Sequence, residues 1–159
     1  MLLNLALALV ASHCTVERAR YALRDDPALT ARFVAVESGL AWPAHLALRL
    51  QSARSGRAYW FLPADGGSDG RQMLASITDP SVPGWQAPDP DGGTRPLGDA
   101  EYIGTDADYT LLDRVPRRGD AAPAHFLVPE LRELLWYRTP SDQREGSARQ
   151  FFDLVGCGE

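Results

Sequence analysis

The sequence predicts an α+β fold, in which an antiparallel β-sheet packs against helices from both ends of the chain. Between residues 45 and 78, apolar and polar residues alternate with the period of two that half-buried strands show. Turn-forming residues interrupt this alternation twice, so the segment predicts three consecutive antiparallel strands. Near both chain ends, apolar residues instead recur every three or four positions, which is the period of an amphipathic helix.

Each strand of the predicted meander corresponds to one run of apolar residues. Residues 46–50 alternate Leu with Ala and Arg and form its first strand. A polar turn with a glycine at 52–56 separates them from a dense aromatic run at 58–62, which is typical of a strand. A second cluster of Gly, Asp and Ser at 65–70 leads into the third run at 73–78.

Further elements are expected on both sides of the meander. The β-branched and aromatic segment 31–37 predicts a strand before it, and the short runs 101–103 and 109–112 predict two strands after it. The expected helices cover residues 15–24, residues 127–137, and a final segment from residue 141 or 146 to residue 155.

Length and charge limit the class of protein. The chain has 159 residues, and residues 13–159 are enough for one globular domain with its own core. Residues 1–63 carry seven Arg and four acids (+3), residues 64–113 two Arg and ten acids (−8), and residues 114–159 seven of each. The acidic middle argues against a nucleic-acid partner, which needs a basic face. It suits a cation, a basic protein partner, or a solvated loop surface.

Residues 1–12 predict a secretory signal peptide. The first 11 residues are almost wholly apolar but too few to span a bilayer, so we expect no integral membrane segment. Small residues before His13 suit cleavage there, which places the protein in the periplasm or outside the cell. Only the amino group of Met1 supplies positive charge ahead of the apolar run. A translation start further upstream, or burial of the segment in an ordinary helix, are the alternatives.

The two cysteines, Cys14 and Cys157, lie at opposite ends of the predicted domain. An even pair in an exported protein predicts a disulfide, which would fasten both termini. Lipidation of Cys14 is an alternative, although His13 stands where a lipobox requires a small residue. Two reduced thiols in a cytoplasmic protein are the remaining possibility.

Residues 79–98 predict a long irregular loop. They contain five Pro and four Gly, and neither the strand period nor the helix period is present. A loop of this length in a compact domain is typically functional or disordered. Its central Trp85 is either an anchor for a ligand or partner, or the residue that folds the loop back onto the domain. The candidate binding residues in the region 79–108 are Trp85, Asp89, Asp91, Asp99 and Glu101.

Metal binding has only weak support in the sequence. The acidic, glycine-rich stretches 65–70 and 89–93 could hold calcium, although neither has the spacing of an EF-hand. Cleavage before His13 would make it the first residue, and its amine and imidazole could then bind copper together with His45 or His125. No spacing of His and Cys indicates a structural zinc site, and we expect no bound cofactor.

Signatures of an enzyme are missing from the sequence. There is no GxSxG elbow, P-loop or GxGxxG motif, and neither cysteine lies in a recognisable catalytic context. We therefore expect a non-enzymatic binding protein and assign no catalytic residue. A small periplasmic enzyme or metal-binding protein that uses His125 or the acidic loops is the alternative. A structural protein of the cell envelope is a third.

The general profile is similar to that of periplasmic inhibitor and immunity proteins of bacteria, which are small, exported and disulfide-bonded. All 16 basic residues are arginine, a usage typical of GC-rich bacterial genomes. The resemblance implies that the acidic region 79–108 binds a basic partner such as a lysozyme-like hydrolase. In this interpretation Trp85 supplies the apolar contact and the acidic residues steer the approach.

Overall fold

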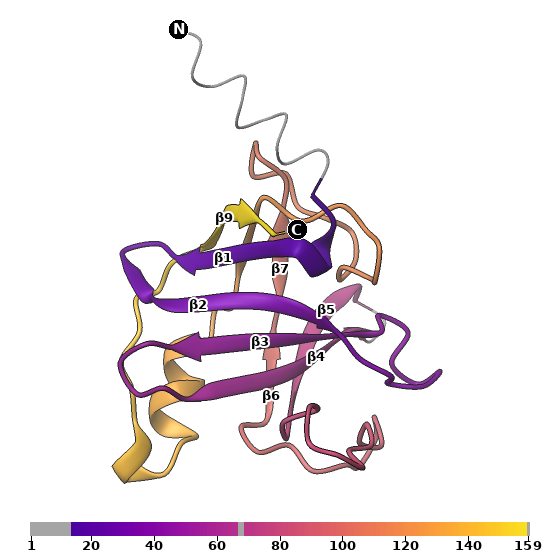
Figure 1. The fold of residues 1–159 in the computed structure, drawn as a ribbon, viewed down its shortest axis with the longest axis vertical. Coiled ribbons are helices and arrows are strands. Elements are labelled where there is room, and N and C mark those ends of the chain that lie inside the picture. Colours follow the sequence, from indigo (N-terminus) through magenta and orange to yellow (C-terminus); the bar gives the residue numbers. More distant parts are fainter. Residues whose placement is uncertain (1–13, 67–68, 159) are drawn as a thin grey trace, which may run out of the picture.

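The computed structural model describes residues 14–66 and 69–158, which form one nine-stranded antiparallel sheet (Figure 1). The strands are β1 (Ala19–Leu23), β2 (Asp26–Ala35), β3 (Leu46–Ser52), β4 (Ala58–Gly66), β5 (Arg71–Ile77), β6 (Asp99–Glu101), β7 (Ile103–Thr105), β8 (His125–Leu127) and β9 (Phe152–Cys157). Their order across the sheet is β6-β5-β4-β3-β2-β1-β9-β8-β7.

The sheet nearly closes on itself as a barrel. β6 and β7 stand at opposite ends of the strand order, yet only Tyr102 separates them along the chain. β6 pairs with β5 and β7 pairs with β8, so residues 99–105 join the two edges. Figure 1 shows these two strands following one another along one side of the barrel. Closure of this kind satisfies the backbone groups that an open sheet leaves unpaired at its edges.

Large aromatic side chains fill the barrel interior. Rings of Tyr21 and Phe152 lie 5.0 and 4.8 Å from the Phe126 ring, and the Tyr102 ring lies 5.5 Å from it. The Phe33 ring completes the group at 5.7 Å from Phe126. These residues alternate along their strands with outward-facing ones, as the pleat requires. Because the rings occupy the interior, the candidate site must be sought on the loops and outer faces.

A second apolar cluster lies on the outer face of the sheet, and we call it the outer cluster. Its buried members are Trp42, Ala47, Leu62, Ala75 and Ile77, and Val36, Trp60, Ala64, Trp85 and Ala87 pack against it. Alternate residues of β3, β4 and β5 face away from the barrel interior and form its base. The cluster extends from the sheet into two loops, one before β3 and one after β5.

The predicted α+β class is wrong, because both terminal helices are replaced mainly by strands. Residues 15–24 form a short 3-10 turn (η1, Val16–Arg18) followed by β1. Their buried residues Val16, Ala19 and Leu23 fit a helical spacing, but buried Tyr21 between them fits only the period of two. The final segment likewise contains a 3-10 turn (η3, Ser141–Gln143) and then β9.

The pairing of β1 with β9 explains why both terminal segments are strands and not helices. Ala19 pairs with Cys157 and Leu23 pairs with Phe152, so each strand supplies hydrogen-bond partners for the other. The partners are distant in the sequence, and no local pattern signals their contact. Of the helix expected over 127–137, a short π-helical segment remains (η2, Glu133–Tyr137), and its Leu134 and Leu135 are buried.

The meander expected over residues 45–78 is present as β3, β4 and β5, which pair consecutively. The strand expected at 31–37 is present as the longer β2. The strand expected at 101–103 is divided between β6 and β7, and of the one expected at 109–112 only a single bridge from Leu111 to Thr105 is present.

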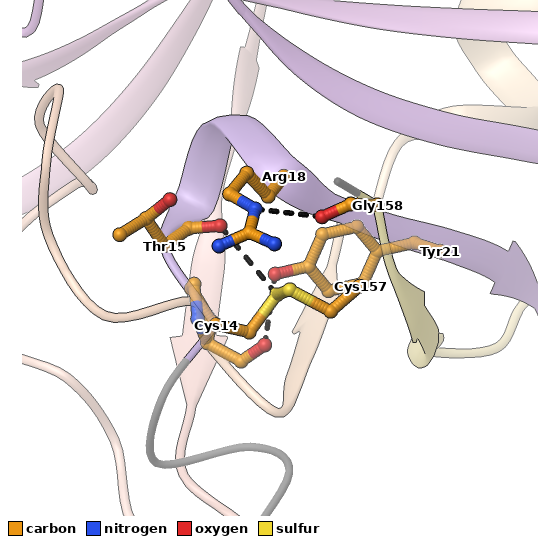
Figure 2. The surroundings of a disulfide bond; sticks show 7 residues. Cys14, Thr15, Arg18, Tyr21, Cys157 and Gly158 are labelled. Atoms are coloured by element: carbon orange, nitrogen blue, oxygen red, sulfur yellow. Dashed lines mark hydrogen bonds between the residues drawn. A yellow bond between two sulfur atoms is a disulfide. The ribbon is translucent and has the colours of Figure 1, made fainter.

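Cys14 and Cys157 form the predicted disulfide (Figure 2), with their Cα atoms 5.8 Å apart. Arg18 and Gly158 beside the disulfide are hydrogen-bonded as well: the Arg18 side chain donates from Nε to the Gly158 carbonyl at 2.6 Å, and Gly158 N donates to the Arg18 carbonyl at 2.7 Å. The bond therefore holds the start of the domain against its last strand. Because the Cys14 sulfur is already bonded to Cys157, it is not free to form the thioether of a lipoprotein.

The predicted signal peptide, residues 1–12, lies outside the residues that the structure describes, as does His13. Within residues 14–66 and 69–158, no helix has the length and apolar character that crossing a membrane requires.

Candidate functional site

The loop 79–98 follows the outer face of β4 and β5 without regular secondary structure. Trp85 and Ala87 pack against the outer cluster, and Trp85 is half-buried. At the end of the loop, Leu97 N donates to Ser76 Oγ at 2.8 Å. The loop is therefore fastened to the sheet by both apolar and polar contacts.

A second loop, residues 36–45 between β2 and β3, joins this one through Trp42. The Trp42 indole donates from Nε1 to the Pro88 carbonyl at 2.8 Å. The guanidinium carbon of Arg95 lies 5.5 Å from the centre of a Trp42 ring, within reach of a cation–π interaction. Trp42 is only 4% exposed, so it acts as the common support of both segments. We call the loops 36–45 and 79–98 the paired loops.

Arg95 braces the acidic part of the longer loop. Its Nη2 donates to the carbonyls of Asp89 (3.2 Å) and Pro90 (3.1 Å), and its Nε donates to Asp99 Oδ1 at 3.2 Å. Asp91 N donates to Asp89 Oδ1 at 2.8 Å, which forms an Asx turn. Arg95 thus connects both ends of the segment 89–99.

The five predicted binding residues fall into two groups. Asp89, Asp91 and Asp99 are exposed and lie in the segment that Arg95 braces. Glu101 is half-buried, and it shares the outer face of β6 with Asp99 because Ala100 between them is buried. Trp85 holds the loop against the sheet and keeps part of its side chain exposed. The structure therefore brings the three aspartates together and leaves Glu101 further along the strand.

Two exposed apolar residues of the paired loops were missed by the sequence analysis. Leu40, at the tip of loop 36–45, is 96% exposed, and Val82 in the longer loop is 56% exposed. The conformation at Leu40 is well supported, since Ser38 Oγ donates to the Trp42 carbonyl at 2.8 Å and Gly39 has a φ of +72°. The turn residues before Leu40 are visible in the sequence, but its exposure depends on the burial of Trp42.

The paired loops carry a surface of negative charge. Asp79, Asp89, Asp91 and Asp99 are all exposed, and the nearby Arg95 is largely covered and engaged in the contacts above. The Ser81 hydroxyl and backbone N–H donate to Asp79 Oδ1 at 2.6 and 2.8 Å and lower the pKa of this carboxyl. A surface that gathers four carboxyl groups can attract a basic partner.

His125, the candidate residue for acid–base or metal chemistry, lies in a different cluster. Its Nδ1 is 2.7 Å from Asp153 Oδ1, and Arg24 binds the same carboxylate through Nε (2.9 Å) and Nη2 (2.7 Å). The Tyr109 ring stacks on the imidazole at 4.4 Å between centres and with an angle of 6° between planes. Burial opposes the charge on Asp153, but hydrogen bonds from Arg24 and His125 outweigh it and lower the pKa of the carboxyl.

This cluster fixes the loop between β7 and β8 to the ends of β1 and β9. Arg24 Nη2 donates to Tyr109 Oη at 2.5 Å, and Tyr109 adopts a left-handed φ of +62°. A tyrosine rarely adopts this conformation unless surrounding contacts impose it. The Asp153–His125 pair has the geometry that orients a general base. The ring is stacked under Tyr109, however, and Arg24 shares its carboxylate, which is the arrangement of a structural clamp.

The metal hypotheses find no assembled site in the described parts of the chain. Among those residues, no group of three or more His, Cys, Asp or Glu side chains is placed to hold a metal ion. Asp89 of the predicted calcium stretch 89–93 instead caps the backbone of Asp91. The stretch 65–70 includes two positions that are not described, and the copper hypothesis rests on His13, which lies outside the described residues.

Comparison of the chain with protein-family models, with curated proteins and with solved structures gives no significant match.

Proposed function

We propose that the protein is an exported, non-enzymatic bacterial binding protein that docks onto a basic partner through the paired loops, in the manner of an inhibitor or immunity protein. The observation that carries this proposal is an acidic loop that Arg95 and Trp42 hold by hydrogen bonds, together with an almost fully exposed Leu40 in the same loop as Trp42. Export is part of the proposal: its supports are the apolar segment 1–12 and the Cys14–Cys157 disulfide, a bond that persists in oxidising compartments.

Rigidity of the loops favours binding. Ordering a flexible loop at an interface costs free energy, whereas a loop that already has its bound conformation avoids that cost. The Trp42–Pro88 hydrogen bond and the contacts of Arg95 supply this order before any partner arrives. Long loops with this degree of support are commonly functional.

Charge and apolar contact have separate roles in the proposed interface. Asp89, Asp91 and Asp99 steer a basic partner and raise the association rate, an effect that salt screens. Leu40 supplies an apolar contact, since its side chain is free to enter a pocket on the partner. Leu40 lies in the turn that the hydrogen bond from Ser38 Oγ to the Trp42 carbonyl closes.

The test begins with capture and ends with a purified pair. The immobilised protein is exposed to an envelope extract of its native host, and bound proteins are identified by mass spectrometry and then purified. We expect a basic protein that binds saturably at low salt and dissociates at about 0.5 M salt. The double variant Asp89→Asn/Asp91→Asn should lower the association rate, whereas Asp142→Asn, an exposed acid in η3, should not.

The apolar contact is tested on the same purified pair. Leu40→Ser should weaken binding at least tenfold if Leu40 enters a pocket, because burial of a leucine is worth about 1.5–3 kcal/mol. Val155→Ser, which changes an exposed apolar residue of β9, serves as the matched control. Equal binding by Leu40→Ser and Val155→Ser, or an acidic partner whose binding resists salt, would refute the proposal.

The Asp153–His125 pair supports a second candidate, a small periplasmic hydrolase in which the imidazole acts as a general base. The His125 Nε2 atom has no hydrogen-bond partner among the residues that the structure describes. Activity against a panel of ester and glycoside substrates that is abolished by His125→Gln, with the fold retained, would favour this candidate. The hydrolase is the weaker of the two candidate functions, because Tyr109 stacks on the His125 ring and Arg24 shares the Asp153 carboxylate.

A further inference from the structure

A groove lies where the start of β4 and the end of β5 meet the segment 138–143, and the two ends of the loop 79–98 form part of its border. Its volume is about 660 Å³, within the range of sites that take small molecules. Apolar side chains of Trp60, Ile77, Leu97 and Pro140 line it, and Arg57 and Arg138 add positive charge. This composition, apolar walls with a few charged groups, is that of a binding site for an organic ligand.

Arg138 forms one wall of the groove, and contacts within the protein hold it in place. Arg138 Nη1 donates to the carbonyls of Leu97 (3.1 Å) and Asp99 (2.8 Å), and its Nε and Nη2 both contact Glu133 Oε1. Thr139 Oγ1 donates to the Leu134 carbonyl at 2.8 Å. The guanidinium of Arg138 is thus committed to holding the segment 138–143 against the loop end, and a ligand would find a preformed surface there.

The floor of the groove is equally fixed. Tyr59 lines it, and its hydroxyl donates to the buried carboxylate of Glu145, which also accepts hydrogen bonds from Ser52 Oγ (2.5 Å) and Ser55 Oγ (2.8 Å). Glu145 is only 8% exposed, so its charge is satisfied beneath the floor and is not presented to the groove. Tyr59 therefore contributes its ring as part of the lining.

Arg57 differs from Arg138 in its partners, which are the side chain of Tyr59 and the backbone of Gln143. Among the residues that the structure describes, Arg57 forms no ion pair with a carboxylate, and its Nη1 donates to the Gln143 carbonyl at 3.0 Å. Asp79 is the acidic residue of the lining, and its Oδ1 accepts both Ser81 donors. An arginine beside apolar walls is the usual means of holding a carboxylate or sulfonate.

A second arginine reinforces the positive charge around Trp60. Arg49 pairs with Trp60 across β3 and β4, and its guanidinium carbon lies 5.5 Å from the centre of a Trp60 ring. Its Nη2 donates to Gln51 Oε1 at 2.6 Å, whereas its buried Nε has no partner among the described residues. Arg49 thus adds positive charge beside the Trp60 ring, in a chain whose net charge is −5.

We propose that this groove binds a small organic anion. An aromatic or aliphatic body lies against Trp60, Ile77 and Leu97, and a carboxylate or sulfonate pairs with Arg57. The apolar walls select against inorganic anions, and the arginines select against organic cations. The groove shares Asp79 and Leu97 with the longer of the paired loops, but its proposed ligand is a small anion that pairs with Arg57, whereas the proposed docking partner is a basic protein.

The test uses anilinonaphthalene sulfonate, an aromatic anion whose fluorescence rises in apolar sites, with the folded full chain. We expect saturable binding at one site with a Kd below about 1 mM, energy transfer from tryptophan, and displacement by a medium-chain alkyl carboxylate. The neutral analogue phenylnaphthylamine and an alkyl trimethylammonium cation should bind at least tenfold more weakly.

Variants place the binding in the groove. Arg57→Gln should weaken binding of the sulfonate about tenfold, and Trp60→Ala should abolish the energy transfer that Trp60 supplies. Arg118→Gln is the matched control, since Arg118 is exposed and its Nη1 lies 3.9 Å from Glu37 Oε1, away from the groove lining. Thermal denaturation of each variant confirms that it is folded.

Backbone NMR shifts of the wild-type protein locate the binding site without any substitution that could affect folding. Titration with the sulfonate should shift amides of residues 57–60, 76–79 and 138–143. Any one of three results would overturn the proposal: no saturation by the folded protein at about 1 mM, equal binding by Arg57→Gln and Arg118→Gln, or shifts confined to another surface. Preference for the cation would overturn it as well.

Discussion

Trp42 and Pro88, which lie 46 positions apart, are joined by a 2.8 Å hydrogen bond from the indole N–H to the proline carbonyl. This bond connects the paired loops and supports the surface that we propose as the docking site. Trp42→Phe keeps a ring in the outer cluster but removes the donor. We expect the free energy of unfolding to fall by about 1 kcal/mol, and the amides of residues 85–95 to exchange faster with deuterium. Trp136→Phe, at an exposed tryptophan of η2, should change neither quantity.

Two adjacent glycines provide a test of how tightly the acidic loop is folded. A Cβ atom on Gly93 would lie 2.5 Å from Pro88 Cβ and 2.7 Å from the Asp89 carbonyl oxygen, whereas one on Gly92 would meet no atom within 4 Å. We expect Gly93→Ala to destabilise the protein by about 1–3 kcal/mol and Gly92→Ala to be nearly neutral. Chemical denaturation measures both. Equal effects of the two changes would mean that the segment 89–93 is not held in the conformation described here.

Two interior tyrosines differ in the hydrogen bonding of their hydroxyl groups. Tyr21 Oη donates to the Pro123 carbonyl at 2.8 Å, whereas the buried Tyr102 Oη has no partner among the described residues. Tyr21→Phe should therefore cost about 1 kcal/mol of stability, and Tyr102→Phe should be neutral or stabilising by a similar amount. The midpoints of urea denaturation compare them directly. A clear destabilisation by Tyr102→Phe would indicate a partner for this hydroxyl, such as an internal water.

The buried carboxylate of Glu145 predicts a loss of stability in acid. Burial opposes its ionisation, but the hydroxyls of Ser52, Tyr59 and Ser55 outweigh burial and lower the pKa of Glu145 below its ordinary value. A carboxyl with a lowered pKa in the folded state contributes stability above its unfolded pKa, about 4.3, and loses it as the pH falls through the folded value. We expect Tm to fall steeply below about pH 4.

The variant Glu145→Gln tests the origin of this acid sensitivity. It should have a lower Tm at neutral pH, because an amide is a poorer acceptor for three hydroxyl groups, and its Tm should change less on acidification. Part of the acid sensitivity should remain, since the pKa of Asp153 is also lowered, by Arg24 and His125 against the effect of burial. Asp142→Asn, an exposed acid nearby in the sequence, should leave the pH profile of the wild type unchanged.

Reduction of the Cys14–Cys157 bond should destabilise the domain strongly. The bond closes a loop with a sequence separation of 143 residues, for which the chain-entropy estimate is about 5 kcal/mol. We expect a large fall in Tm with reductant and an intact mass that rises by about two units. The double variant Cys14→Ala/Cys157→Ala should show the same loss and no response to reductant. A Tm unaffected by reduction would contradict the stabilising role of the bond.

The sequence predicts the central meander because every signal for it is local. The alternation in β3 and the glycine turns fall within a few residues of the strands they define. The terminal strands lack such signals, since β1 gains its partner β9 only when the chain folds. The spacing of Val16, Ala19 and Leu23 is compatible with a helix. The burial of Tyr21 is not compatible with that helix, and it shows that the segment is a strand. Long-range pairing thus overrides a local pattern.

The candidate site was predictable to a similar extent. Composition indicates that residues 79–98 form an acidic loop, because Pro, Gly and Asp have strong local preferences. The exposure of Leu40 depends on where Trp42 is buried, and Trp42 finds Pro88 only in the folded barrel. The groove beside Trp60 combines residues of four separate segments, so no single stretch of sequence indicates it.

The disulfide also decides how the domain would respond to mechanical force. A pull applied at the two ends of the described chain acts on Cys14 and Gly158, on either side of the Cys14–Cys157 bond. The load therefore passes through a covalent bond that bypasses all nine strands, and the hydrogen bonds of the barrel are not stretched. The length stored in residues 15–156 is released only after reduction. In a single-molecule pulling experiment, the oxidised protein should act as a short inextensible link, whereas the reduced protein should unfold.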